Sequence, residues 1–166
     1  MTRLGLLLTL TEPPLSMEEE FNAWYDTEHL AERLSIPGFR SARRWVADCR
    51  PGEGKYLATY ELDSLAVLES EAYLKYFNKQ SPWSRRCLGK TVVFRRWACE
   101  QIDPGDAAPY PLARAVVYRP GDLAVPGCLQ ARRFAAASGE TITLLELGEH
   151  PPSLPAGVLL YRAYAA

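Results

Sequence analysis

The densest group of chemically capable side chains lies in one short stretch, Trp24-Tyr25-Asp26-Thr27-Glu28-His29. The imidazole of His29 titrates near neutral pH, which suits the transfer of a proton. The carboxyl groups of Glu28 and Asp26 are close enough in the chain to orient such an imidazole. These residue types predict general acid–base chemistry, with His29, Glu28 and Asp26 as candidate catalytic residues. A packed histidine without a catalytic part is the alternative, and the sequence leaves it open.

Glu28 also has an unusual position for a carboxylate. On a helical wheel it shares the apolar face with Phe21 and Trp24. Burying a carboxylate without a partner is costly, so we expect Glu28 to have one, such as Arg43 or Arg44 on a strand. Glu28 then either anchors the helix to the sheet or takes part in acid–base chemistry in a pocket between them.

Aromatic side chains are expected to line the same space. Tyr56 and Tyr60 point to one side of a predicted strand, and Tyr73 on a later helix can approach that side. A mostly apolar pocket with a few polar tips is typical of ligand sites. Ordinary aromatic core is the alternative. The candidate binding residues are Trp24, Tyr25, Tyr56, Tyr60, Tyr73 and Arg44.

The first hundred residues predict the elements that position these side chains. Short apolar runs bounded by Pro and Gly indicate strands, and Ser16 followed by three glutamates indicates a helix start. The expected order is strand, helix, strand, strand, helix, strand, which is the ferredoxin-like unit. The ranges are 3–11, about 17–34, 39–49, 55–62, 65 to about 78, and 91–101.

A repeat extends this pattern to the rest of the chain. Pro37-Gly38 followed by Ala42-Arg43-Arg44-Trp45 returns as Pro126-Gly127 followed by Ala131-Arg132-Arg133-Phe134. Two later strand segments return in the same order. The second copy is shorter, and its connections are too short or too rich in proline for helices.

The predicted organisation is a complete ferredoxin-like repeat at 1–102, a linker at 103–111, and a degenerate repeat of four strands without helices at 112–166. The fold class is α+β, and the tandem repeat is expected to form a barrel-like pseudo-dimer. The alternative is a single irregular sheet domain in which the similarity between the two halves of the sequence arose by chance.

Composition narrows the function classes. The 166-residue chain has a net charge of −1, so nothing in its charge favours nucleic acid or an anionic membrane. Four scattered cysteines predict reduced thiols in the cytoplasm. No zinc-ligand spacing and no phosphate or dinucleotide motif is present, so no metal or cofactor is expected. His150, in a proline-rich loop, is expected at the surface.

The segment from Trp24 to His29, followed by Ile36-Pro37-Gly38-Phe39 and Ala42-Arg43-Arg44-Trp45, resembles the EthD-like members of the dimeric α+β barrel superfamily. The resemblance covers about residues 1–101. It implies a cleft between the helices and the sheet that His29 can face. In related polyketide cyclases the position of Tyr73 can hold a catalytic histidine. Because the superfamily normally builds its barrel from two chains, the resemblance implies an intrachain pseudo-dimer here, and a further homodimer stays open.

Three functions therefore follow from the sequence. The first is a metal-independent enzyme that uses acid–base chemistry, as a cyclase, isomerase or lyase does, on a small hydrophobic, aromatic or polyketide-like molecule. The second is a non-catalytic small-molecule-binding or accessory protein. The third is haem binding through His29. The sequence alone does not decide whether the protein is an enzyme.

Overall fold

Eight antiparallel strands close into a barrel in the computed structural model, which describes residues 2–165. The order around the barrel is β1-β3-β2-β8-β5-β7-β6-β4. The first and second halves of the chain join where β2 pairs with β8 and where β4 pairs with β6. The strands are β1 (Gly5–Glu12), β2 (Phe39–Ala47), β3 (Tyr56–Leu62), β4 (Val93–Asp103), β5 (Ala115–Pro120), β6 (Gln130–Ala136), β7 (Thr141–Leu147) and β8 (Tyr161–Ala163).

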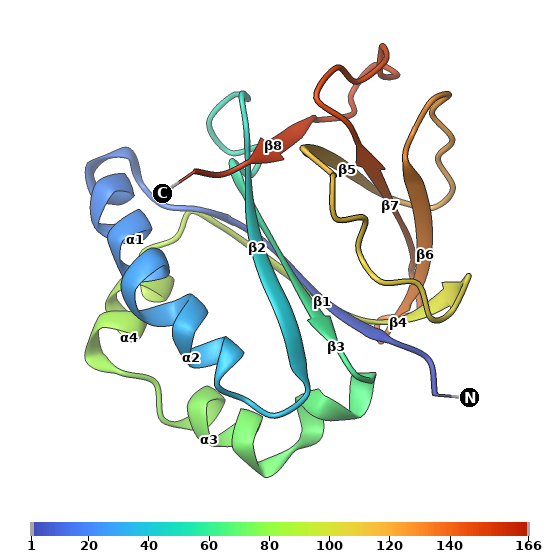
Figure 1. The fold of residues 1–166 in the computed structure, drawn as a ribbon. Coiled ribbons are helices and arrows are strands. Elements are labelled where there is room, and N and C mark those ends of the chain that lie inside the picture. Colours follow the sequence, from blue (N-terminus) through green and yellow to red (C-terminus); the bar gives the residue numbers. More distant parts are fainter. Residues whose placement is uncertain (1, 166) are drawn as a thin grey trace.

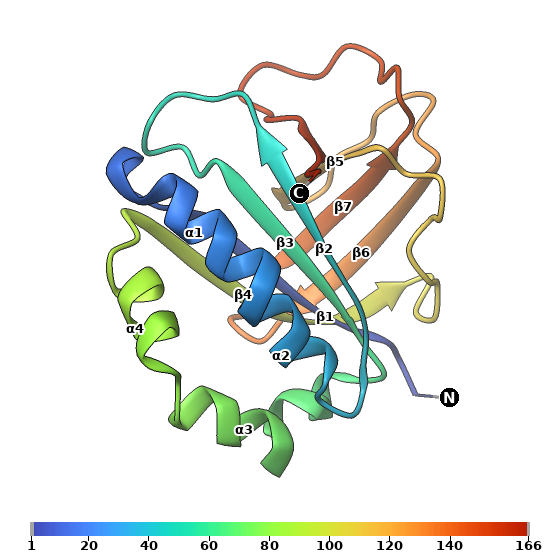
Figure 2. The ribbon, with the colours of Figure 1, turned by 60° about the vertical axis from the view of Figure 1, so that its left-hand side comes forward.

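All helical segments lie on one side of the barrel, against the outer face of the strands of the first half (Figures 1 and 2). Within 112–165, the described chain forms strands and loops and no helix. The helical segments are η1 (Leu15–Met17), α1 (Glu18–Trp24), η2 (Tyr25–His29), α2 (Leu30–Leu34), η3 (Leu65–Glu69), α3 (Glu71–Asn78) and α4 (Pro82–Gly89).

Side-chain alternation along the strands creates separate cores. On β1, Leu6, Leu8 and Leu10 point into the barrel, where they meet Trp45 and Trp97. Their neighbours on β1 point outward, beneath the helices, and the Leu7 side chain packs in the core between helices and sheet. A third, smaller cluster on the outer face of β5 and β7 is covered by loops. The apolar interior leaves the barrel without a channel, because its side chains fill it.

The expected helices differ from the observed ones at three places. The expected helix from 65 to about 78 is a 3₁₀ segment, η3, and a separate helix, α3, with Ser70 in an extended conformation between them. The expected helix at 17–34 is interrupted by a π-helical turn, η2. The helix α4 was not expected at all, although Ser81 caps it by accepting a hydrogen bond from the backbone N–H of Ser84 at 3.0 Å, and Pro82 occupies its first turn. A single turn-forming Ser-Pro pair is also common in loops, so it did not by itself predict a helix.

Candidate active site

A cavity of about 60 Å³ lies between the helices and the outer face of the first-half strands. Its walls come from β1, β3, β4, η2, α2, α3 and α4, so it occupies the space that the resemblance implied for a cleft. Two arginines and one histidine line it, and no aspartate or glutamate does. The lining residues are Leu7, Thr9, Thr11, Tyr25, His29, Arg33, Tyr60, Tyr73, Phe77, Gln80, Leu88, Phe94 and Arg96.

His29 sits at the end of the π-helical turn η2 and is only 6% exposed. Its ring stacks on Trp24 with a centroid separation of 4.4 Å and meets the edge of Tyr25 at 4.9 Å. Its Nδ1 has no hydrogen-bond partner within residues 2–165. Burial, followed by the charges of Arg33 and Arg44, holds the pKa of His29 well below its ordinary value. The imidazole is therefore neutral near pH 7 and able to accept a proton.

Arg33 lies one helical turn after His29 and is 8% exposed. Its guanidinium carbon stands 5.4 Å from the centre of the Tyr73 ring, and Nη1 has no hydrogen-bond partner in the described chain. A buried guanidinium without a carboxylate carries an uncompensated desolvation cost. A second cation reaches the cavity from β4, where Arg96 donates a 2.9 Å hydrogen bond to the hydroxyl of Tyr73.

Hydroxyl groups complete the polar part of the cavity. The hydroxyls of Tyr25 and Tyr60 are 2.7 Å apart, and burial raises the pKa of Tyr60 well above its ordinary value. One of these hydroxyls donates to the other, which leaves one O–H of the pair free to donate. The Oγ1 of Thr9 on β1 is buried and has no partner within residues 2–165. Three of the four buried side-chain atoms without a partner in that range, from Thr9, His29 and Arg33, thus line one cavity.

The expected catalytic partner Glu28 points elsewhere. Its carboxylate accepts hydrogen bonds from the hydroxyls of Ser81 at 2.7 Å and Ser84 at 3.2 Å, and from Nε1 of Trp24 at 3.1 Å. Glu28 thus joins the first helix to α4. Its partners are hydroxyls and an indole, where the sequence suggested a strand arginine.

Asp26, Arg44 and Tyr56 form a second group outside the cavity. The Nη1 of Arg44 lies 3.4 Å from the Asp26 carboxylate, and its guanidinium carbon is 4.2 Å from the centre of the Tyr25 ring. The Tyr56 hydroxyl donates to Glu18 at 2.5 Å. Of the residues predicted for the site, the structure brings Trp24, Tyr25, His29, Tyr60 and Tyr73 together at the cavity, with Trp24 behind the His29 ring.

Sequence reasoning missed Thr9, Arg33 and Arg96. Arg33 follows His29 by four residues, so helical spacing was a usable signal for it. Thr9 and Arg96 share a face with Leu7 and Phe94, respectively, and only the pairing of β1 with β4, which sets Thr9 opposite Arg96, brings them together.

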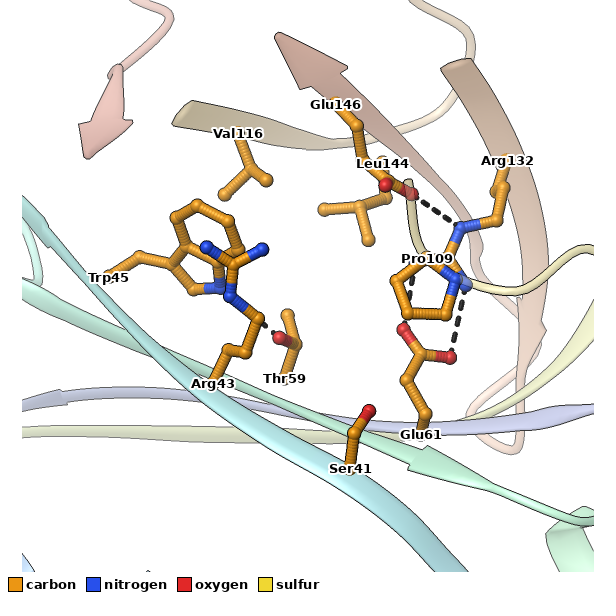
Figure 3. Close-up of a pocket in the computed structure, with 10 residues that line it drawn as sticks. All are labelled: Ser41, Arg43, Trp45, Thr59, Glu61, Pro109, Val116, Arg132, Leu144 and Glu146. Carbon is orange, nitrogen blue, oxygen red and sulfur yellow. Dashed lines mark hydrogen bonds and ion pairs between the residues drawn. The ribbon is translucent and has the colours of Figure 1, made fainter. Parts of the chain in front are cut away.

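A second concave region lies inside the barrel, and its arginine and glutamate side chains form ion pairs with each other (Figure 3). The guanidinium of Arg132 bonds the Glu61 carboxylate at 2.8 and 3.0 Å and the Glu146 carboxylate at 2.7 Å. Arg43 stacks over the Trp45 ring at 4.2 Å nearby. The remaining space is about 10 Å³, which is no more than one water needs. Because these charges already neutralise one another, this region is a structural ion-pair cluster.

The cavity residues do not fit a haem group. A space of about 60 Å³ lies far below the roughly 300–1,000 Å³ of pockets that enclose drug-sized ligands. The His29 ring is also stacked against Trp24, which covers one of its faces. Within residues 2–165, no group of three or more His, Cys, Asp or Glu side chains is arranged to hold a metal ion. The same range contains no helix with the length and apolarity needed to cross a membrane.

Comparison with known proteins identifies the fold. No protein-family model matches the chain. A chlorite dismutase-like protein of known crystal structure superposes with a TM-score of 0.63 at 8% identity, covering 99% of this chain and 96% of that one. An anthrone oxidase-like protein superposes with a TM-score of 0.62 at 10% identity, covering 99% and 92%. The fold is an eight-stranded α+β barrel like that of these neighbours, and the EthD-like assignment is not confirmed.

In sequence, the chain is similar to core atranone cluster (CAC) protein 1 of Stachybotrys chlorohalonatus (strain IBT 40285), with 33% identity over 81 residues. The match spans 47% of this chain and 34% of the relative. The chain therefore covers about a third of the length of the curated relative that it matches.

Proposed function

We propose that the protein is an enzyme that moves protons on a small aromatic or polyketide-like ketone, with His29 as the general base and no metal in the step. The observation that carries this proposal is the clustering of unpartnered buried polar atoms of Thr9, His29 and Arg33 on one cavity. Perturbed titratable groups that share a cavity with unused donors are a mark of active sites.

The chemical step follows from the position of each group. The neutral imidazole of His29 takes a proton from a carbon next to the substrate carbonyl, and the electron pair of the broken C–H bond moves into an enolate. The guanidinium of Arg33 and the free O–H of the Tyr25–Tyr60 hydroxyl pair stabilise the charge on the enolate oxygen. The imidazolium returns the proton at another carbon or oxygen, so the step is redox-neutral, as in an isomerisation or an aldol-type cyclisation.

The size of the cavity places the larger part of the substrate at its mouth. About 60 Å³ admits a carbonyl or carboxyl group but no fused ring system. Phe77 on α3 and Phe94 on β4 line the same cavity and are 48% and 52% exposed. Exposed aromatic side chains at the entrance suit a flat aromatic ring.

The comparisons support the substrate class. The relative is named for a core atranone cluster, and one neighbour of known structure is anthrone oxidase-like. We propose that this chain acts on a small aromatic or polyketide-like molecule and that it belongs to the EthD-like part of the dimeric α+β barrel superfamily. Unpaired cysteines at 49, 87, 99 and 128 favour a cytoplasmic setting.

We also propose that the barrel arose from a tandem repeat, as an intrachain pseudo-dimer. The first-half strands run β4-β1-β3-β2 around the barrel, and the second-half strands run β8-β5-β7-β6 in the same pattern. Glu61 and Glu146, which occupy matching places in the two copies, both bind Arg132. Only the first copy carries the helices, which confines the proposed site to residues 1–102. A true homodimer stays a prediction.

A non-catalytic small-molecule-binding protein is the second candidate, because the cavity would also serve binding alone. Solvent-exchange kinetics separate the two. We expect the protein to speed the exchange of the α-protons of 2-tetralone, an aromatic ketone, in D₂O, followed by NMR. His29→Gln should slow this exchange about 10²- to 10⁴-fold, the usual contribution of a general base. The matched control, His150→Gln, should leave it unchanged. An exchange rate that His29→Gln does not alter would exclude the acid–base role.

A further inference from the structure

Arg33 is a buried cation that forms no ion pair within the described chain, where only the longer-range charge of the neighbouring Glu32 acts on it. The side chain is only 8% exposed, and its Nη1 has no hydrogen-bond partner within residues 2–165. Its guanidinium carbon lies 5.4 Å from the centre of the Tyr73 ring. The comparison inside the same molecule is Arg132, which is 1% exposed and which two carboxylates hold at 2.7 and 2.8 Å. This fold therefore neutralises one buried guanidinium and leaves another open to a cavity.

Cationic side chains line the cavity around Arg33 and acidic ones do not. Arg96 lines it from β4, and its lining contains no aspartate or glutamate. Neutral donors lie on the same space, since the hydroxyl of Thr9 is unpartnered and the Tyr25–Tyr60 pair has one O–H beyond its mutual hydrogen bond. Donors without acceptors require an acceptor from outside, and a charged acceptor forms the stronger hydrogen bonds.

We propose that the cavity is a binding site for an organic monoanion, an aromatic carboxylate, with the carboxylate against Arg33 and the ring at the mouth beside Phe77 and Phe94. The volume of about 60 Å³ is several times the roughly 10–15 Å³ that one water needs by the same measure, so it has room for a carboxylate group. A neutral ketone meets this charge only when its enolate forms, whereas a carboxylate meets it as soon as it binds. The proposal deepens the proposed function and rests on the same cavity, but it does not require that His29 transfers a proton.

Binding of benzoate, measured by calorimetry on the full chain, tests the proposal. Benzoate should bind, acetate should bind more weakly because it lacks the ring, and the isosteric neutral benzamide should not bind measurably. Arg33→Gln should weaken benzoate binding about 10- to 100-fold, the loss expected for a charge-assisted contact. Arg85→Gln, an exposed arginine on α4, is the matched control and should bind benzoate like the wild type.

Two further readouts separate this proposal from a structural effect and from the proposed function. Without ligand, Arg33→Gln should melt at a higher temperature than the wild type, because it removes an unpaired buried charge; a merely structural arginine would give the reverse. His29→Gln should retain benzoate binding while losing proton exchange on 2-tetralone. Equal binding of benzoate and benzamide, or benzoate binding that Arg33→Gln leaves intact, would overturn the anion site even if proton exchange were found. Benzoate binding without proton exchange would instead overturn only the enzyme.

Discussion

At the scale of single residues, burial decides what each ionisable group can do. The imidazole of His29 and the guanidinium of Arg33 are both buried on one cavity, yet they respond differently. Histidine can become neutral when its surroundings disfavour charge, whereas arginine stays charged. The pair therefore combines a proton acceptor with a fixed positive charge, which is the arrangement that enolate chemistry needs.

The lowered pKa of His29 predicts a pH effect on stability. The unfolded chain binds a proton at His29 as the pH falls below about 6.5, while the folded protein resists protonation there until lower pH. The free energy of unfolding should therefore fall with acidification in this window, by up to about 1.4 kcal/mol per pH unit from this group. Urea unfolding from pH 7 to 5 should show a shallower pH dependence in His29→Gln than in the wild type. Identical slopes would mean that His29 titrates alike in both states.

Replacement of Arg33 by a neutral side chain predicts a gain in stability. Arg33→Met removes an unpaired buried charge and keeps most of the apolar stem, so the free energy of unfolding should rise by about 1–3 kcal/mol, the scale of an unsatisfied buried group. Urea denaturation in ligand-free buffer measures this change. A loss of stability instead would indicate that the guanidinium has a partner that supports the fold.

At the scale of elements, the π-helical turn η2 and the short helix α4 position the site. A π-turn inserts an extra residue into the helical register, and such turns are frequent at functional sites. With it, Trp24, Tyr25 and His29 are all buried on the sheet side. Helix α4 holds this turn in place through the hydrogen bonds from Ser81 and Ser84 to Glu28.

The cap of α4 gives a prediction at this scale. Ser81→Ala removes the hydrogen bond to the Ser84 backbone and a donor to Glu28. Loss of a serine N-cap costs about 0.5–2 kcal/mol, so the free energy of unfolding in urea should fall by this amount. Ser138→Ala, which removes only an exposed contact with Glu140, should have no measurable effect. Equal changes in the two variants would argue against the anchoring role.

Most elements, and the histidine and aromatic side chains of the candidate site, could be predicted from local pattern, but its arginines and the direction of Glu28 could not. The alternation of Leu6, Leu8 and Leu10 with Leu7 and Thr9 marks a strand with two covered faces, and Pro37-Gly38 marks the end of the first helix. The side chain of Glu28 could not be placed, because its direction depends on the π-turn and on a helix more than fifty residues later. The importance of Arg33 was hidden because an arginine near a helix end usually has a solvated charge.

At the scale of the whole molecule, the two halves of the chain share one barrel but have different surroundings. Helices cover the first-half strands and loops cover the others (Figure 1). The ion-pair cluster of Arg132 with Glu61 and Glu146 ties β3, β6 and β7 together across the interior. Its charges neutralise one another, whereas three of the four unpartnered buried polar atoms of residues 2–165 lie at the cavity on the helix-covered face.

This cluster predicts a mutational effect opposite in sign to that of Arg33→Met. Arg132→Met leaves two buried carboxylates without their cation, and breaking a buried pair in this way costs about 3–5 kcal/mol. Urea denaturation of the two arginine-to-methionine variants side by side measures the contrast. Similar changes in both would mean that the two buried arginines have equivalent surroundings.

The most direct measurement of the central claim is a crystal structure of the protein with bound benzoate. The benzoate carboxylate should lie within hydrogen-bond distance of Arg33, in the cavity beside His29. Its ring should be directed toward Phe77 and Phe94. Benzoate bound elsewhere on the barrel, with the Arg33 cavity closed or holding only water at a saturating concentration, would contradict it.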